Sequence, residues 1–327
     1  MRCPRAIAKQ DMAKYLHVRL CPLSAAAMSD APAPAHMGID GFDADAFIAA
    51  TLAEDLGDKG DITGNAVIPA DARFDSVMDT RDDVIVAGLP LAAAFFRALD
   101  PDCQIEILAE EGAFVAAGGD LMRISGRARA LLAAERSALN SVQHLTGIAT
   151  MTRAYVDAMA AGGAGAGAGG GARLLDTRKT IPGLRRLEKY ATRMGGAQNH
   201  RMGLWDAAMI KDNHIAVAGS VERAARRAAA AGIKHIIVEV DDIAQIEPAL
   251  AGGATHLLLD NMDVPALRAC VALVAGRVPT EASGGVRLDT IAAIAASGVD
   301  YVSVGRLTQS APAADIGLDH VAQNVAR

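Results

Sequence analysis

The second half of the chain alternates short apolar runs with Ala-rich segments of helical periodicity. The last four runs recur every 21 to 24 residues, and helical spacing fills the intervals between them. Continuous apolar strands that alternate with helices are typical of a parallel sheet covered on its outer face, so the pattern predicts a (β/α) barrel. The runs are Leu174–Asp176, Ala208–Lys211, Ile236–Glu239, Leu257–Asp260, Val278–Glu281 and Val302–Gly305, and the helical segments are Ser220–Ala231, Asp242–Leu250, Asp263–Ala275 and Arg287–Ser297.

The first half has a mixed pattern. Phe42–Leu56 has helical spacing, and Phe74–Val86 and Cys103–Ile124 hold short strand-like runs separated by glycines. Leu131–Met159 predicts a long helix, with a break expected near Gly147. These elements favour a separate α/β domain before the barrel.

Two segments offer no side chains for chemistry. Gly162–Gly171 is almost pure Gly and Ala and is interpreted as a flexible loop. Residues 1–37 are basic and poor in acidic residues, but they lack the compact apolar stretch of a secretory signal. We interpret them as a disordered extension, or as the product of a start codon placed too far upstream.

Composition excludes several classes of protein. The formal net charge of the 327 residues is −6, which argues against a general nucleic-acid binder. No apolar run reaches the roughly 20 residues that span a bilayer. The four cysteines have no C-x-x-C spacing, so they predict reduced thiols in a cytoplasmic protein and no zinc site. They are Cys3, Cys21, Cys103 and Cys270.

Charged and small residues collect where the predicted strands end. In barrels the active site lies at the carboxyl ends of the strands. One such residue alone is usually a solvated loop charge or a helix N-cap, the role we expect for Asp242 and Asp263. Together they predict a cationic site for carboxylates or phosphates, because Arg and Lys suit both groups. They are Asp176, Thr177, Arg178, Lys179, Asn199, His200, Arg201, Lys211, Asp212, Glu239, Asp260, Asn261, Glu281, Ser283, Gly284, Gly285, Gly305 and Arg306.

Two groups within this set suggest particular chemistry. Ser283-Gly284-Gly285, with Gly305 and Arg306 after the next strand, could hold a phosphate through backbone N–H groups, although a plain turn would have the same sequence. Glu239 and Asp260 could bind sugar hydroxyls or Mg²⁺, or stabilise a positive charge. The residues alone thus predict a barrel enzyme with a multiply anionic substrate and do not name its reaction.

Several longer strings together resemble the quinolinate phosphoribosyltransferase family. The resemblance runs from about Phe42 to the C-terminus and leaves out residues 1–37 and 162–171. It implies an N-terminal α/β sandwich domain over 38–147, completed by 308–327, and an incomplete (β/α) barrel over 148–307. The strings are Glu54–Gly57 with Gly60–Thr63, Asp176–Arg185, Asn199–Leu204, Ile210–His214, Leu259–Asn261 and Glu281–Gly285.

The resemblance also implies an activity and a role for each site residue. Members of this family join quinolinate to phosphoribosyl pyrophosphate and release pyrophosphate and carbon dioxide, a step of NAD biosynthesis. Mg²⁺ accompanies the phosphoribosyl pyrophosphate near Glu239 and Asp260, and no organic cofactor is implied. The implied catalytic residues are Lys179, Lys211, Glu239 and Asp260, and the implied substrate-binding residues are Arg136, Thr177, Arg178, His200, Arg201, Ser283, Gly284, Gly285, Gly305 and Arg306.

Arg136 is the one residue of this set outside the barrel. It shares a helical face with Asn140, Gln143 and His144, which a solvated polar face would also explain. The resemblance implies a homodimer in which this helix contributes to the partner's barrel, and it leaves open whether dimers assemble further. We expect small-molecule substrates, with no nucleic acid and no membrane as partner.

Three other interpretations remain open at this point. The chain could be a relative of this family with another aromatic acid as substrate or with a role in metal transport. It could be a carbon–carbon lyase that uses Lys211 as a Schiff-base lysine. It could also be a phosphate-binding barrel without catalysis, which would leave Lys211, Glu239 and Asp260 without a task.

Overall fold

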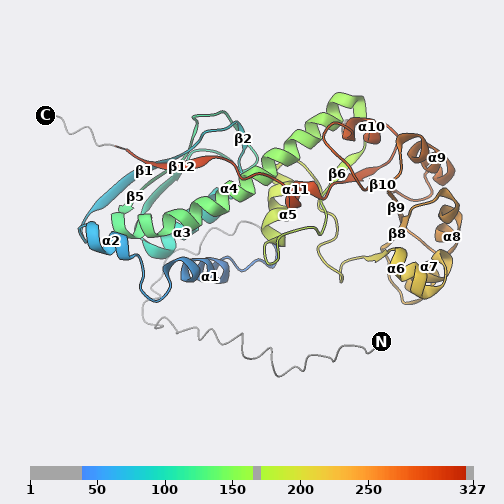
Figure 1. Ribbon diagram of the computed structural model, residues 1–327, viewed down its shortest axis with the longest axis horizontal. Coiled ribbons are helices and arrows are strands. Elements are labelled where there is room, and N and C mark those ends of the chain that lie inside the picture. Colours follow the sequence, from blue (N-terminus) through green and yellow to red (C-terminus); the bar gives the residue numbers. More distant parts are fainter. Residues whose placement is uncertain (1–38, 165–170, 322–327) are drawn as a thin grey trace, which may run out of the picture. The chain divides into compact units, whose positions relative to one another are not determined.

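The computed structural model describes residues 39–164 and 171–321 (Figure 1). The predictions for residues 1–37, for Cys3 and Cys21, and for most of the Gly/Ala loop lie outside the described residues. Cys103 and Cys270 are buried and unpaired, as expected for reduced thiols. Within the described ranges, no helix is both long and apolar enough to cross a bilayer.

The N-terminal half contains a four-stranded antiparallel sheet with the order β12-β1-β5-β3, and a separate two-stranded ladder of β2 and β4. Strand β12 lies near the C-terminus of the chain, and its pairing with β1 brings residues 316–320 back to this first sheet. The strands are β1 (Arg73–Thr80), β2 (Val84–Ile85), β3 (Gln104–Ile107), β4 (Phe114–Val115), β5 (Asp120–Arg127) and β12 (Ile316–His320).

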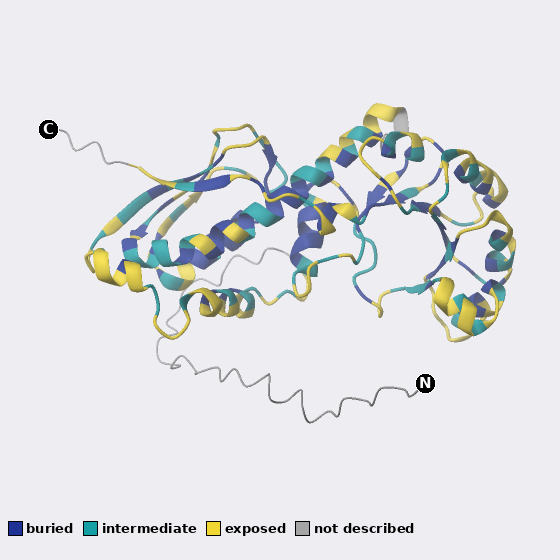
Figure 2. Cartoon of the chain, viewed as in Figure 1, coloured by how far each residue is buried: buried dark blue, intermediate teal, exposed yellow. Residues whose placement is uncertain are grey.

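Helices cover this sheet and enclose a shared apolar core (Figure 2). Phe95 and Phe96 of α3 are fully buried, together with Met78 of β1 and Leu145 of α4. The side chain of Asp43 caps α1 by accepting a hydrogen bond of 2.9 Å from the backbone N–H of Ala46. The helices are α1 (Ala44–Leu56), α2 (Ile62–Val67), α3 (Leu89–Leu99) and α4 (Ala128–Met159), followed by the π-helical turn η2 (Ala160–Ala164).

The expected break near Gly147 is wrong, because α4 continues through this residue. A Cβ atom at position 147 would lie 1.9 Å from the carbonyl oxygen of Pro312. The glycine is therefore explained by the close approach of the segment around Pro312, and not by an interruption of the helix.

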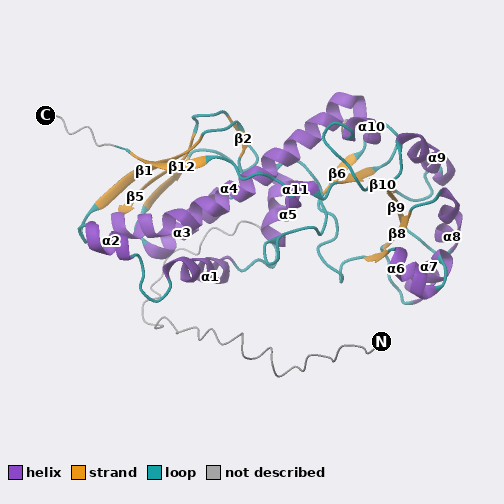
Figure 3. Cartoon of the chain, in the orientation of Figure 1, coloured by secondary structure: helices purple, strands orange, loops and turns teal. Residues whose placement is uncertain are grey.

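The second half forms a six-stranded parallel sheet with the order β6-β11-β10-β9-β8-β7 (Figure 3). In the described part of the chain, β6 and β7 form the two edges and do not pair with each other. The sheet is therefore an incomplete barrel, as predicted. The strands are β6 (Arg173–Leu175), β7 (Ala208–Ile210), β8 (Ile236–Val240), β9 (His256–Asp260), β10 (Thr280–Ser283) and β11 (Tyr301–Ser303).

The predicted helical segments of the barrel are present, and Asp242 and Asp263 are N-caps, as expected. The segment Arg287–Ser297 contains a shorter helix than the pattern indicated. Three helices of this half, α5, α6 and α11, were not predicted. The helices are α5 (Arg185–Met194), α6 (Asp212–Ala218), α7 (Val221–Ala230), α8 (Ile246–Ala251) after the 3-10 turn η3 (Ile243–Gln245), α9 (Val264–Val274), α10 (Ile291–Ala295) and α11 (Arg306–Gln309).

Candidate active site

A cavity of about 810 Å³ lies at the carboxyl ends of the barrel strands. Because parallel strands end at one edge of the sheet, residues far apart in the sequence converge there. The structure brings most candidate site residues of the barrel to this cavity, but Asp176, Asn199 and Asp212 do not line it. Its lining includes Thr177, Arg178, Lys179, His200, Arg201, Lys211, Glu239, Asp260, Ser283, Gly284, Gly285, Gly305 and Arg306.

Two guanidinium groups give the cavity a strongly cationic region. Burial, and after it the positive charge of Arg178, lowers the pKa of Arg201. The Nε atom of Arg178 is buried and has no hydrogen-bond partner among the described residues. A donor left unsatisfied beside a second cation is the arrangement expected for a site that binds an anionic ligand.

The lysine and carboxylates of the site form an ion pair and a hydrogen bond. Nζ of Lys211 is paired with the Glu239 carboxylate, and Oδ2 of Asp260 accepts a hydrogen bond of 2.6 Å from Nδ2 of Asn261. The Lys211 amine is thus engaged by an acid and is not placed as a free nucleophile.

The backbone conformation after β10 favours glycine at positions 284 and 285. Gly284 has φ +89°, and a Cβ atom there would lie 2.2 Å from Oδ1 of Asn261. Gly285 has φ +60° and has open space where a Cβ would be. The Lys179 side chain packs over Gly305, where a Cβ would lie 2.8 Å from Cδ of Lys179. These loops therefore expose backbone to the cavity beside a lysine, which suits a phosphate.

Two family models match the chain: the quinolinate phosphoribosyl transferase N-terminal domain over residues 61–146 and the C-terminal domain over residues 148–319. Together they cover most of its length. The chain belongs to the quinolinate phosphoribosyltransferase family.

Individual members of this family are similar over nearly their whole length. A chloroplastic carboxylating nicotinate-nucleotide pyrophosphorylase of Oryza sativa is 38% identical over 92% of this chain and 83% of its own. A probable carboxylating nicotinate-nucleotide pyrophosphorylase of Synechocystis is 39% identical and covers 85% of this chain and 92% of its own. The crystal structure of nicotinate-nucleotide pyrophosphorylase from Ehrlichia chaffeensis has a TM-score of 0.80 and 36% identity, covering 86% of this chain and all of that one.

The described carboxylates of the present chain do not form a complete metal-binding site by themselves. In residues 39–164 and 171–321, no group of three or more His, Cys, Asp or Glu side chains could hold a metal ion. Glu239 and Asp260 are two hard oxygen donors at the cavity. They fit Mg²⁺ only if the ion takes its remaining oxygens from a substrate and water, which is its usual mode of binding.

A buried ion pair beneath the cavity was missed from the sequence. Asp176 and Lys189 are paired, and both side chains are at most 1% exposed. Asp176 also accepts hydrogen bonds from Nδ2 of Asn199 at 2.6 Å and from the backbone N–H of His200 at 2.8 Å. The pair therefore fixes the segment that carries His200 and Arg201.

Three consecutive residues of α5 with polar groups are buried, namely Glu188, Lys189 and Tyr190. Oε1 of Glu188 lies 2.9 Å from Nε2 of His144 on α4. The Tyr190 hydroxyl donates a hydrogen bond of 2.6 Å to Glu111 in the N-terminal half. Helix α5 thus connects the strand-end loops of the barrel to the first domain.

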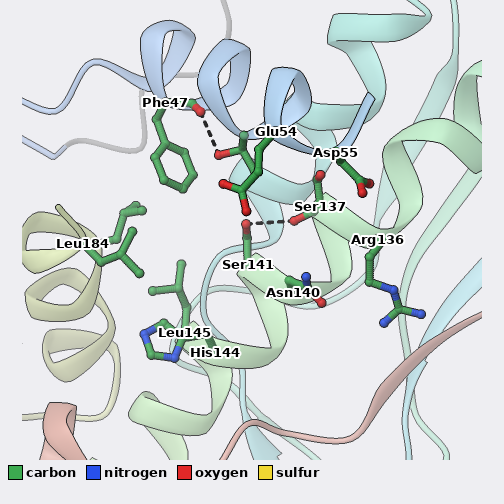
Figure 4. A pocket seen from close by; sticks show the side chains of 12 residues that line it. Phe47, Glu54, Asp55, Arg136, Ser137, Asn140, Ser141, His144, Leu145 and Leu184 are labelled. Carbon is green, nitrogen blue, oxygen red and sulfur yellow. Dashed lines mark hydrogen bonds between the residues drawn. The ribbon is translucent and has the colours of Figure 1, made fainter. Parts of the chain in front are cut away.

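Arg136 lies apart from the other site residues of its own chain. It lines a second cavity, of about 380 Å³, between α1 and α4 (Figure 4). Asn140 and His144 of α4 line the same cavity, together with Phe47 and Glu54 of α1. Arg136 is exposed, and among the described residues its guanidinium makes no hydrogen bond or ion pair. Within one chain, the structure does not bring Arg136 to the barrel.

Proposed function

We propose that this chain is an active quinolinate phosphoribosyltransferase. The observation that carries the proposal is the cavity itself, in which the neighbouring Arg178 and Arg201 guanidiniums and the Gly284–Gly285 loop line one space. Two guanidiniums suit the two carboxylates of quinolinate, and exposed glycine backbone suits the 5′-phosphate of phosphoribosyl pyrophosphate. Family membership supports the pairing of these two ligands.

The chemistry follows from charge. As the bond between the ribose C1 and the pyrophosphate oxygen breaks, its electron pair leaves with pyrophosphate, and the pyridine nitrogen of quinolinate forms the new bond to C1. The nitrogen then carries a positive charge, which stabilises the electron pair left on C2 as the bond to the 2-carboxylate breaks and carbon dioxide departs. A proton then binds at C2, which gives nicotinate mononucleotide.

The residues of this chain favour these steps by neutralising charge. Lys179 and Lys211 offset the negative charge of the substrates and of the leaving group. Glu239 and Asp260 stabilise the cation-like ribose carbon. These two carboxylates would also hold Mg²⁺ together with pyrophosphate oxygens, and when bound the ion supplies further neutralisation there.

The proposal includes a homodimer in the cytoplasm. Arg136 is an exposed cation whose guanidinium makes no hydrogen bond or salt bridge in the described part of its own chain. A second copy that presents Arg136 to the barrel cavity would add a third guanidinium to the dicarboxylate site. A two-fold dimer would then contain two equivalent sites, each built from both chains.

Release of pyrophosphate and carbon dioxide tests the proposal, with quinolinate as substrate and nicotinate as the control. Nicotinate lacks the 2-carboxylate and would leave a half-buried guanidinium unpaired, whereas truncating one partner of a fully buried charge pair costs about 2–5 kcal/mol. We expect kcat/KM for quinolinate to exceed that for nicotinate by more than about tenfold. Equal use of the two acids, or of neither, would reject the function.

A further inference from the structure

Glu281 is a buried carboxylate that no step above uses. It lies on β10, is fully buried, and lines the barrel cavity together with His200 and Ser303. Neither carboxylate oxygen makes a well-aligned hydrogen bond to the described residues. Burying a carboxylate is costly unless neighbouring polar groups compensate for the lost water, so the groups around Glu281 decide its charge.

The groups that face Glu281 are two imidazoles. Its Oε2 lies 3.3 Å from Nε2 of His200 and 2.9 Å from Nε2 of His256. The His256 ring stacks on Tyr301, with 5.7 Å between the ring centroids. Burial alone would raise the pKa of Glu281, but hydrogen bonding by the two histidines and Ser303 lowers it. The carboxylate is therefore a fixed negative charge beneath the cavity at neutral pH.

Both ring nitrogens of His200 face protein groups. Nδ1 accepts a hydrogen bond of 2.7 Å from the backbone N–H of Arg201. An atom that accepts this hydrogen bond cannot itself carry a proton, so the ring proton of His200 is on Nε2, the atom that faces Glu281. His200 therefore presents a ring face or carbon edge, and not a free N–H group, to a ligand in the cavity.

We propose that Glu281 is a positioning residue, which fixes His200 in its neutral Nε2–H form and maintains a negative charge under the substrates. The role rests on the proposed transferase function. The charge opposes binding of a dicarboxylate in the ground state. The same charge favours the transition state, in which the ribose carbon and the ring nitrogen become positive. Such an interaction raises kcat at the expense of affinity.

The Glu281→Gln variant tests the electrostatic part of this role, because glutamine preserves the shape and removes the charge. We expect kcat with quinolinate to fall about tenfold or more, while benzene-1,2-dicarboxylate, an unreactive dianion, binds about threefold more tightly. Glu281→Asp keeps the charge and should not bind the dianion more tightly. Glu247→Gln is the matched control, since Glu247 is an exposed carboxylate that pairs with Arg277 on the outside of the barrel.

A role in stability alone would weaken turnover and dianion binding together, and that result in Glu281→Gln would overturn the proposal. A second measurement needs only the wild-type chain. NMR of histidine-labelled protein at pH 7.5, with His200 assigned by His200→Gln, should show an unprotonated Nδ1. A proton on Nδ1 would overturn the proposal even if the Gln variant did not fold. The NMR result does not depend on turnover, so a failure of the transferase assay in the wild type would be recognised separately.

Discussion

The backbone carbonyl oxygen of His200 accepts a hydrogen bond of 2.8 Å from Nζ of Lys189, a lysine whose side chain is almost completely buried. The same ammonium is paired with Asp176, which in turn binds the backbone N–H of His200. One buried ion pair thus contacts both polar backbone groups of His200. The cavity wall at this point is held by a helix and a strand end that lie outside the substrate space.

Replacing Lys189 by methionine should destabilise the chain strongly. Burial raises the pKa of Asp176 and lowers that of Lys189, so each charge is maintained mainly by the other. Removing one partner of a buried ion pair costs about 3–5 kcal/mol. Urea unfolding would measure this loss, and the double variant Asp176→Asn/Lys189→Met should recover part of it. A single variant as stable as the wild type would refute the role of the pair.

Variants of the two cavity carboxylates should affect the chemical step more than binding. Glu239→Gln and Asp260→Asn each remove a negative charge whose interaction strengthens as the ribose cation forms. We therefore expect kcat to decrease more than KM for quinolinate increases. Steady-state kinetics at saturating phosphoribosyl pyrophosphate would show the difference. A change confined to KM for quinolinate would argue against the assigned roles.

Two inactive variants should restore activity when they are combined in one dimer. Arg136→Ala and Lys211→Ala are each expected to be nearly inactive. In a mixed dimer one site carries both changes and the other carries neither, so after random exchange about a quarter of all sites should be intact. Pyrophosphate release after joint unfolding and refolding, compared with each variant refolded alone, measures the recovery. If verified mixed dimers remained inactive, Arg136 would not serve the partner's barrel.

The ionisation of Glu281 should contribute to stability above pH 4.5. Its pKa in the folded chain lies below the ordinary value of 4.5. The contribution is therefore complete above 4.5 and is lost as the pH falls through the folded-state pKa, with a limiting slope of about 1.4 kcal/mol per pH unit. Between pH 5 and pH 3, the unfolding free energy of the wild type minus that of Glu281→Gln should decrease as the pH falls and approach this slope. Parallel profiles would show that folding does not lower the pKa of Glu281.

Gly147→Ala should destabilise the chain although alanine is the better helix former. The added Cβ would meet the backbone carbonyl of Pro312, which cannot move as a flexible side chain can. We expect a loss of about 1–3 kcal/mol, the usual cost of overpacking. Thermal unfolding would measure it. Asn140→Ala, at an exposed position of the same helix, is the control and should change stability by less than about 0.5 kcal/mol.

The parallel sheet and the cavity residues could be predicted because strand ends are local features of the sequence. Once Leu257–Asp260 and its neighbouring runs are read as parallel strands, geometry alone brings their polar ends together. The supporting residues could not be predicted in this way. Glu188 and Lys189 have the pattern of a solvated helix, and only their distant partners His144 and Asp176 explain why they are buried. The role of Gly147 likewise depends on a segment more than 160 residues away.

Helix α4 has a practical consequence for combining this chain with its relatives. The two family models meet at residues 146 and 148, in the interior of a continuous helix that extends from Ala128 to Met159. A hybrid protein joined at that position would build α4 from the halves of two different proteins. Both halves would have to pack against the Pro312 segment of only one of them. A domain exchange should instead take all of α4 from one protein, together with the residues around Pro312 that pack against Gly147.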